Sequence, residues 1–188
     1  MIAKQLTIRL AIFFFILPFQ HIHPQQSMDA YHYGLPVFPN VAGFGLDSKG
    51  GSGGQIIRVT SLSKDGKGSL AEAIQSKGPR IIVFEVAGVI DLEGNTLEIS
   101  EPFITIAGQT APSPGVTIIK GGIKIRTHDV IIQHLKVRPG EAGHKKKSGW
   151  ESDGISTTMG AYNVIIDHCS LTWATDENLT ASGPRFYG

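Results

Sequence analysis

The sequence predicts an all-β solenoid in which short parallel strands stack along one axis. Blocks rich in β-branched residues recur at intervals of about 23, 26 and 34 residues, which is the range expected of solenoid repeats. The blocks are residues 81–84, 104–107, 130–134 and 164–168. The chain also has 23 glycines among 188 residues and no long helical pattern, as the repeated tight turns of a solenoid require. A single short strand cannot bury itself, so we expect successive blocks to pair in one parallel sheet.

The bulk composition is that of one globular domain. Hydrophobic residues make up 41% of the chain and charged residues 18%. The formal net charge of +1 argues against a nucleic-acid binder with a broadly basic surface. Cys169 is the only cysteine, so no disulfide can form within the chain, and we expect it to be a small core residue.

The N-terminus has the pattern of a signal peptide. Lys4 and Arg9 precede an apolar run at 10–17, which is too short for a bilayer that requires about 20 residues. We therefore expect residues 1–27 to be a signal peptide with an uncertain cleavage site, and the protein to be secreted or periplasmic. A retained anchor or a buried segment is the alternative. Residues 28–188 would then form the solenoid.

The first elements after this leader are a turn, a strand and a short helix. The glycine-rich stretch 50–54 lacks a Gly-Lys-Ser/Thr ending, so it predicts a turn beside a strand at 55–60 and not a phosphate-binding loop. Ser69 and Glu72 have capping-box spacing, and Gly78-Pro79 ends the helix that follows. We expect this helix to cap the open N-terminal end of the solenoid. Residues 139–150 are polar and lysine-rich, which predicts a loop inserted into one coil and explains the widest interval.

Four motifs, in this order, resemble the pectate lyases of the first polysaccharide lyase family. They are GPRIIVF at 78–84, GVIDL at 88–92, TIAGQTAP at 105–112 and VIIDHCS at 164–170, and the likeness covers about residues 36–180. The resemblance implies a right-handed parallel β-helix, export from the cell, and calcium-assisted β-elimination of pectin or polygalacturonate.

Acidic residues that flank two strands are the candidate calcium ligands. Ca²⁺ takes six to eight oxygens, and stacked strands about 4.8 Å apart bring acids from different coils together. The resemblance places a calcium-binding aspartate about a dozen residues before the Ile-Asp-His motif, where this chain has Asp153. It also implies two carboxylates in the next coil, four residues apart. Asp176 matches the first loosely, Thr180 stands at the second, and Glu177 could replace it. The alternative is a set of solvated turn acids.

Asp167 and His168 lie in the signature segment, and the resemblance gives them a structural role in support of the groove. A histidine in an apolar strand is more often a hydrogen-bonded core residue than a ligand or a catalyst. His134, at the corresponding position one coil earlier, indicates a stack of histidines.

The remaining expectations concern substrate and catalysis. Lys145, Lys146 and Lys147 could attract a polyanionic chain, with Trp150 as a sugar-stacking face, although a lysine run is commonly just a solvated loop. The resemblance implies an arginine base in a later coil, which we expect beyond residue 188. We therefore expect the chain to be the N-terminal part of a longer enzyme, with little or no lyase activity alone.

Two alternative functions remain open. One is a non-catalytic secreted β-helix that binds polysaccharide, and the other, less favoured, is a β-helical glycoside hydrolase with paired acids. In every case we expect no nucleic-acid partner and no membrane association after signal cleavage. The complete enzyme is expected to be a monomer.

Overall fold

The structure is a computed structural model that describes residues 45–145, 149–158 and 160–182. The chain divides into two compact units, residues 1–33 and residues 34–188, and the following account concerns the second. The expected signal peptide at 1–27 lies outside the described residues. None of the described residues form a helix long and apolar enough to cross a membrane.

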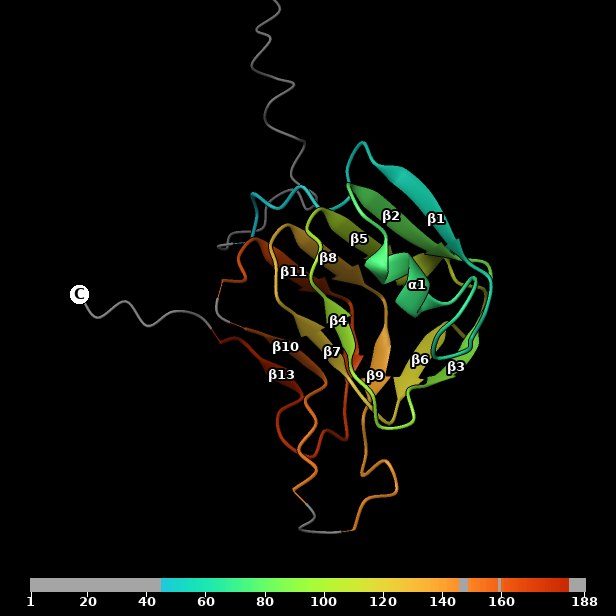
Figure 1. Cartoon of the computed structure of the whole chain (residues 1–188), viewed down its shortest axis with the longest axis vertical. Helices are drawn as coiled ribbons and strands as arrows, with labels where there is room; N and C mark the ends of the chain where they lie inside the picture. The colour runs from blue at the N-terminus through green and yellow to red at the C-terminus, as the bar shows by residue number, and fades with distance from the viewer. Residues whose placement is uncertain (1–44, 146–148, 159, 183–188) are drawn as a thin grey trace, which may run out of the picture. The chain divides into compact units, whose positions relative to one another are not determined.

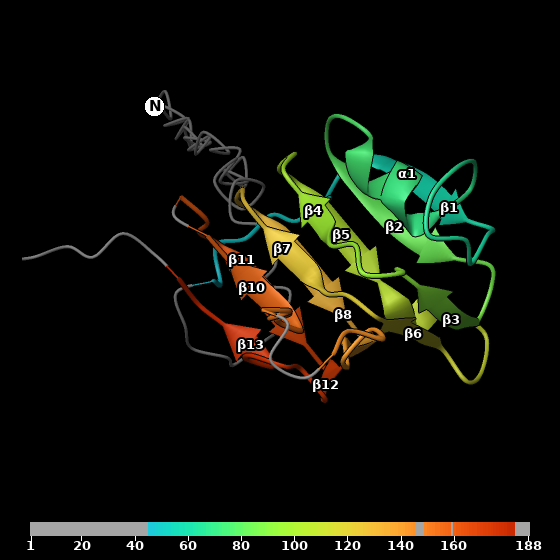
Figure 2. The same cartoon turned by 60° about the horizontal axis from the view of Figure 1, so that its bottom comes forward.

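The described chain folds into three parallel sheets that it visits in turn (Figure 1). Sheet 1 contains five strands, β1 (Gln55–Val59), β2 (Arg80–Phe84), β5 (Ile104–Ala107), β8 (Val130–Gln133) and β11 (Val164–Asp167). Sheet 2 contains β3 (Gly88–Asp91), β6 (Val116–Ile119), β9 (Lys136–Arg138) and β12 (Ser170–Leu171). Sheet 3 contains β4 (Leu97–Ile99), β7 (Ile123–Ile125), β10 (Ile155–Thr157) and β13 (Leu179–Thr180). Figure 2 shows the successive coils side by side along the stack. The predicted right-handed parallel β-helix is confirmed.

The recurring blocks of the sequence are the strands of sheet 1. Ile82 pairs with Ile106, Ile106 with Ile132, and Ile132 with Ile166, so one isoleucine from each coil lies in the same internal column. The first three are fully buried, and Ile166 packs against the same core. The register holds across the insertion at 139–150, because that loop leaves after β9 and returns at β10. Its described residues form turns and bends and no strand.

The predicted capping helix is α1 (Leu70–Gln75). Ser69 is its N-cap and accepts a hydrogen bond from the Glu72 N–H at 3.1 Å. In a capping box the carboxylate at the position of Glu72 accepts a hydrogen bond from the N–H of the N-cap residue. Here Glu72 accepts instead from the N–H of Gly68, the residue before the N-cap, at 2.6 Å. Leu70 and Ile74 enter the main core, and α1 packs against β1, β2 and β4, the first strands of sheets 1 and 3. The helix therefore closes the core at the first coil.

Arg80, the first residue of β2, is fully buried beneath α1. Its guanidinium group donates to four backbone carbonyl oxygens, those of Ile74 at 2.7 Å, Pro102 at 3.0 Å, Gly78 at 3.1 Å and Glu101 at 3.2 Å. The Ile74 carbonyl belongs to the last turn of α1, where backbone carbonyl groups have no hydrogen-bond partner within the helix. Arg80 thus joins the end of the helix to the turn before β5.

The glycine-rich stretch forms the predicted turn next to β1. A side chain at Gly51 would place its Cβ 1.8 Å from the Arg80 carbonyl oxygen, so only glycine allows this close approach. Cys169 is half-buried and packs against the core, as predicted. Burial raises the pKa of its thiol, which makes it a poor nucleophile.

Candidate functional site

Asp153, Asp176 and Glu177 form a carboxyl cluster at one end of sheet 3. Asp153 lies two residues before β10, and Asp176 and Glu177 lie just before β13. Backbone hydrogen bonds hold the two segments together, from the Gly154 N–H to the Glu177 carbonyl at 2.9 Å and from the Ile155 N–H to the Asn178 carbonyl at 3.1 Å. The strand pairing of the β-helix therefore places these three predicted ligand residues side by side.

The geometry of the carboxyl cluster fits one calcium ion. One carboxylate oxygen from each residue lies within 4.8 Å of the other two. Two oxygens on opposite sides of one Ca²⁺ are about 4.6–5.2 Å apart, because each lies about 2.3–2.6 Å from the ion. In the part of the chain that the structure describes, no lysine or arginine forms an ion pair with these carboxyl groups. Three acids together without a protein cation are chemically suited to a hard divalent ion.

The electrostatics of the carboxyl cluster also favour a bound cation. The pKa of Glu177 is raised, first by its hydrogen bond with Asp176, and further by desolvation and by the negative charges of Asp176 and Asp153. A raised pKa for an exposed glutamate shows that its ionised form is opposed by its neighbours. A bound cation would relieve this repulsion. Thr180, at the position where the resemblance implies a carboxylate, donates to Glu177 at 3.4 Å.

A hollow of about 100 Å³ lies beside Asp153 on the outer side of sheet 3. Trp150 and Lys124 are among its lining residues. The Trp150 indole N–H donates to the Gly140 carbonyl at 3.1 Å, and its ring stacks on His144 at 4.5 Å. One face of the predicted sugar-stacking tryptophan is therefore covered by His144.

The lysine run of the inserted loop is only partly described. Lys145 is exposed, whereas Lys146 and Lys147 lie outside the described residues. A role of these lysines in substrate binding stays a prediction.

Asp167 and His168 lie at the end of β11 in sheet 1, whereas the carboxyl cluster belongs to sheet 3. The Asp167 carboxylate bonds the His168 ring at 2.6 Å and accepts from Gln133 at 3.2 Å. Burial raises the pKa of Asp167, but the hydrogen bonds from Gln133 and His168, with the nearby histidines, lower it overall. These contacts form a polar ladder between neighbouring coils.

The predicted histidine stack is present, but its burial was predicted wrongly. The rings of His134 and His168 are stacked at 4.8 Å, as expected. However, 67% of the His168 side chain is exposed, so it is not a core residue. Both histidines follow a strand and have positive φ values, 53° for His134 and 50° for His168. The left-handed backbone at each histidine interrupts the alternation of inward and outward side chains along the strand, and the rings lie at the surface.

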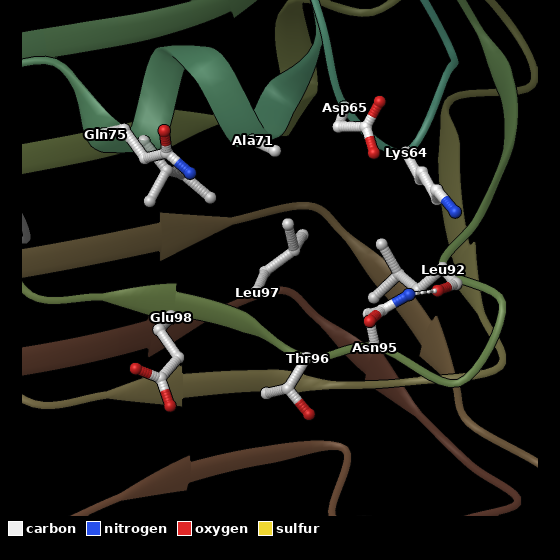
Figure 3. Close-up of a pocket in the computed structure, with 10 residues that line it drawn as sticks. Lys64, Asp65, Ala71, Gln75, Leu92, Asn95, Thr96, Leu97 and Glu98 are labelled. Atoms are coloured by element: carbon white, nitrogen blue, oxygen red, sulfur yellow. Dashed lines mark hydrogen bonds between the residues drawn. The ribbon is translucent and has the colours of Figure 1, made fainter.

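A larger hollow of about 250 Å³ lies between α1 and β4 (Figure 3). Its floor is apolar, with Leu92 and Leu97, and Asn95 donates to the Leu92 carbonyl at 2.8 Å. Lys64, at its rim, is paired with Glu93 at 2.5 Å. Size alone would favour a hollow of about 290 Å³ lined by His134, Lys136 and His168. Two groups of potential metal ligands lie in the described part of the chain: His134, Asp167 and His168 offer two ring nitrogens, whereas the carboxyl cluster offers the oxygens that Ca²⁺ takes. We take the carboxyl cluster as the candidate site because a group of charges with no ion-pair partner among the described residues is the stronger indication of function.

Two surface residues near the site were missed in the sequence analysis. Lys124 stands between two isoleucines in β7, and this alternation predicts an outward-facing side chain. Trp173 is 72% exposed, and the Arg138 guanidinium lies 5.5 Å from the centre of its ring. A large exposed aromatic ring is a common feature of carbohydrate and protein contacts, but nothing in the local sequence distinguishes Trp173 from a core residue.

No protein-family model matches the chain. Curated relatives do match it. A protein named "Probable pectate lyase C" from Emericella nidulans is 41% identical over 150 residues, which cover 79% of this chain and 34% of that protein. A protein of the same name from Aspergillus terreus is 37% identical, again over 79% of this chain and 34% of that protein. The protein "Pectate lyase 5" from Ambrosia artemisiifolia is 29% identical over 71% of this chain and 37% of that protein.

The crystal structure of Jun a 1, the major allergen from cedar pollen, aligns with a TM-score of 0.59 and 23% identity over 75% of this chain and 44% of that chain. This likeness supports the fold. The chain spans about a third of the length of the curated relatives from Emericella nidulans and Aspergillus terreus, at 34% of each. Over the aligned residues the chain is similar to proteins named as pectate lyases, as its motifs indicate.

Proposed function

We propose that the carboxyl cluster binds calcium and that this chain contributes the calcium-binding part of a pectate lyase acting on polygalacturonate by β-elimination. The observation that carries the proposal is the meeting of Asp153, Asp176 and Glu177, within 4.8 Å, without a protein cation among the described residues. The names of the curated relatives support the substrate class.

The three carboxylates would supply only part of a calcium coordination shell. Ca²⁺ takes six to eight oxygens, so a uronate carboxylate and water can complete the shell on the open side. Calcium that is bound to a uronate carboxylate supplies a Lewis acid, which favours loss of the neighbouring proton. The protein's own contribution is to fix the carboxyl cluster through the backbone bonds between residues 152–155 and 175–178.

Three further parts of the proposal rest on the resemblance. The base of the elimination is an arginine. Residues 1–27 direct the protein out of the cell, where pectin is accessible. The complete enzyme is a monomer, and it requires neither nucleic acid nor a membrane.

The test is a calorimetric calcium titration of the 188-residue chain and of Asp153→Ala. Extracellular calcium sites commonly bind with a Kd of about 10⁻⁴ to 10⁻³ M, and we expect a value in this range for the unaltered chain. Asp153→Ala removes one of three carboxylates and should weaken binding by at least about tenfold.

Asp65→Ala is the matched control, because Asp65 is an exposed aspartate distant from the carboxyl cluster in the fold. It should bind calcium as the unaltered chain does. Equal calcium affinity for Asp153→Ala and the unaltered chain would remove Asp153 from the site. No calcium binding by the unaltered chain would refute the proposal as a whole.

A further inference from the structure

Lys124 occupies the centre of the outer side of sheet 3. It pairs in register with Glu98 of β4 on one side and with Ser156 of β10 on the other. Its neighbours along β7, Ile123 and Ile125, point into the core and are buried, so the lysine side chain faces outward. Lys124 is therefore one coil away from the segment that carries Asp153.

The described strands contain five lysines and arginines, and four of them have a partner. Arg58 is paired with Glu85, and Arg80 binds backbone carbonyls. Lys136 donates to the Pro114 carbonyl at 2.8 Å, and Arg138 donates to Thr172 at 3.3 Å. These four cations have structural partners.

Lys124 differs from them. Within the described residues its ammonium group forms neither a hydrogen bond nor an ion pair, although the side chain is half-buried. The adjacent carboxylate of Glu98 is bound by Arg126 at 3.2 Å instead. An ammonium group that has no counter-ion among the described residues is available to a bound anion.

The hollow beside Asp153 places this cation next to the carboxyl cluster. Lys124, Asp153 and Trp150 all line it, yet no ion pair joins Lys124 to Asp153. One residue of the proposed calcium site, Asp153, and an ammonium group without a partner among the described residues thus line the same hollow. A polymer that repeats a carboxylate on every sugar could use both at once, with one carboxylate on the bound calcium and a neighbouring one on Lys124.

We propose that Lys124 is a specificity-determining residue that binds a free uronate carboxylate next to the calcium-bound one, so that this position of the groove rejects a methyl ester. The inference rests on the proposed function. Its physical basis is that an ammonium group gains a charge-assisted hydrogen bond from a carboxylate, whereas a neutral ester leaves the cation unpaired. Selectivity arises because the wrong ligand leaves a polar group of the site without a partner.

The experiment measures binding of two oligogalacturonates to the 188-residue chain by calorimetry at saturating calcium, one free of ester and one fully methyl-esterified. Lys124→Gln should weaken binding of the unesterified oligomer by about tenfold and leave the ester's binding unchanged. Lys124→Arg, which keeps the charge, should retain most of the preference. Lys136→Gln is the matched control, since it removes a half-buried strand lysine of sheet 2, and it should change neither affinity.

The outcomes separate this inference from the proposed function. If the unaltered chain binds calcium and the unesterified oligomer, and Lys124→Gln binds that oligomer equally well, the inference alone is overturned. The same holds if Lys124→Gln weakens both oligomers equally, or if it loses calcium binding in the absence of sugar. If the unaltered chain binds no calcium and neither oligomer, the proposed function and the inference fall together.

Discussion

The molecule has two charged regions whose surroundings differ, Arg80 beneath α1 and the carboxyl cluster beside β10 and β13. Arg80 is fully buried and donates to four backbone carbonyls. Asp153, Asp176 and Glu177 face one another, and within the described chain no lysine or arginine pairs with them. The Arg80 charge has hydrogen-bond partners inside the fold, whereas the three carboxyl groups have no ion-pair partner among the described residues and lie next to like charges.

This difference separates a structural charge from a candidate binding charge. Burial lowers the pKa of Arg80, with the nearby Glu101 acting against it, and the carbonyl oxygens around the guanidinium group favour its charged form. Repulsion within the carboxyl cluster raises the pKa of Glu177. A charge that the fold satisfies contributes to stability, whereas a cluster that the fold leaves unsatisfied reduces stability until a ligand binds. Each of the following measurements tests one side of this contrast.

The largest effect is expected at Arg80. Arg80→Leu removes the donor for four carbonyl oxygens, including that of Ile74 at the end of α1, and should lower the free energy of unfolding by about 3 kcal/mol. Urea unfolding followed by circular dichroism measures this change. Arg80→Lys keeps the charge but not the planar guanidinium fork, so it should lower the free energy of unfolding by less than Arg80→Leu does.

The matched control for Arg80 is Arg58→Leu, because Arg58 is a strand arginine whose single ion pair with Glu85 is exposed. It should change stability by less than about 1 kcal/mol. If Arg80→Leu is as stable as the control, the buried guanidinium is not a structural group and the contrast fails.

A smaller effect of opposite sign is expected at Asp176. Without calcium, Asp176→Asn removes one of three mutually repelling charges and should raise the Tm by about 2 °C. With saturating calcium the order should reverse, because the variant binds the ion less tightly. Asp65→Asn serves as the control and should show no reversal. A variant that is less stable in both conditions would mean that Asp176 stabilises the fold directly.

The smallest effect is expected in the pH dependence of stability, to which Glu177 and Asp167 contribute differently. The folded chain binds the Glu177 proton more tightly than the unfolded chain does, since the folded pKa is raised. Without calcium, stability should therefore fall as the pH rises from the ordinary pKa of Glu177 through its folded value. Calcium or Glu177→Gln should abolish this slope.

Asp167 should behave in the opposite way and at lower pH. Its folded pKa is lowered, so its contribution to stability is complete above its ordinary pKa and is lost as the pH falls through the folded value. Thermal unfolding between pH 3 and pH 7, about the range in which carboxyl groups titrate, distinguishes the two slopes. A stability that rises with pH across the Glu177 interval in calcium-free buffer would contradict the repulsion within the carboxyl cluster.

The sequence by itself determined the solenoid and its first cap. The recurring β-branched blocks fixed the strands of sheet 1, because a period of about two to three dozen residues allows only stacking between coils. Ser69 and Glu72 fixed the start of α1, since capping chemistry is local. The motifs also directed attention to Asp153, Asp176 and Glu177. In each case the informative contacts lie within a few residues or follow one regular repeat.

Only the tertiary structure decided which charges are satisfied. The pairing of residues 152–155 with 175–178 sets the distance between Asp153 and Glu177, and this pairing depends on the length of the turns between coils. Arg80 is buried because its partners come from the end of α1 and from the turn before β5. Lys124 has no partner among the described residues, since Arg126 binds the neighbouring Glu98. These facts depend on which side chains meet across coils, and the order of residues along the chain does not specify that.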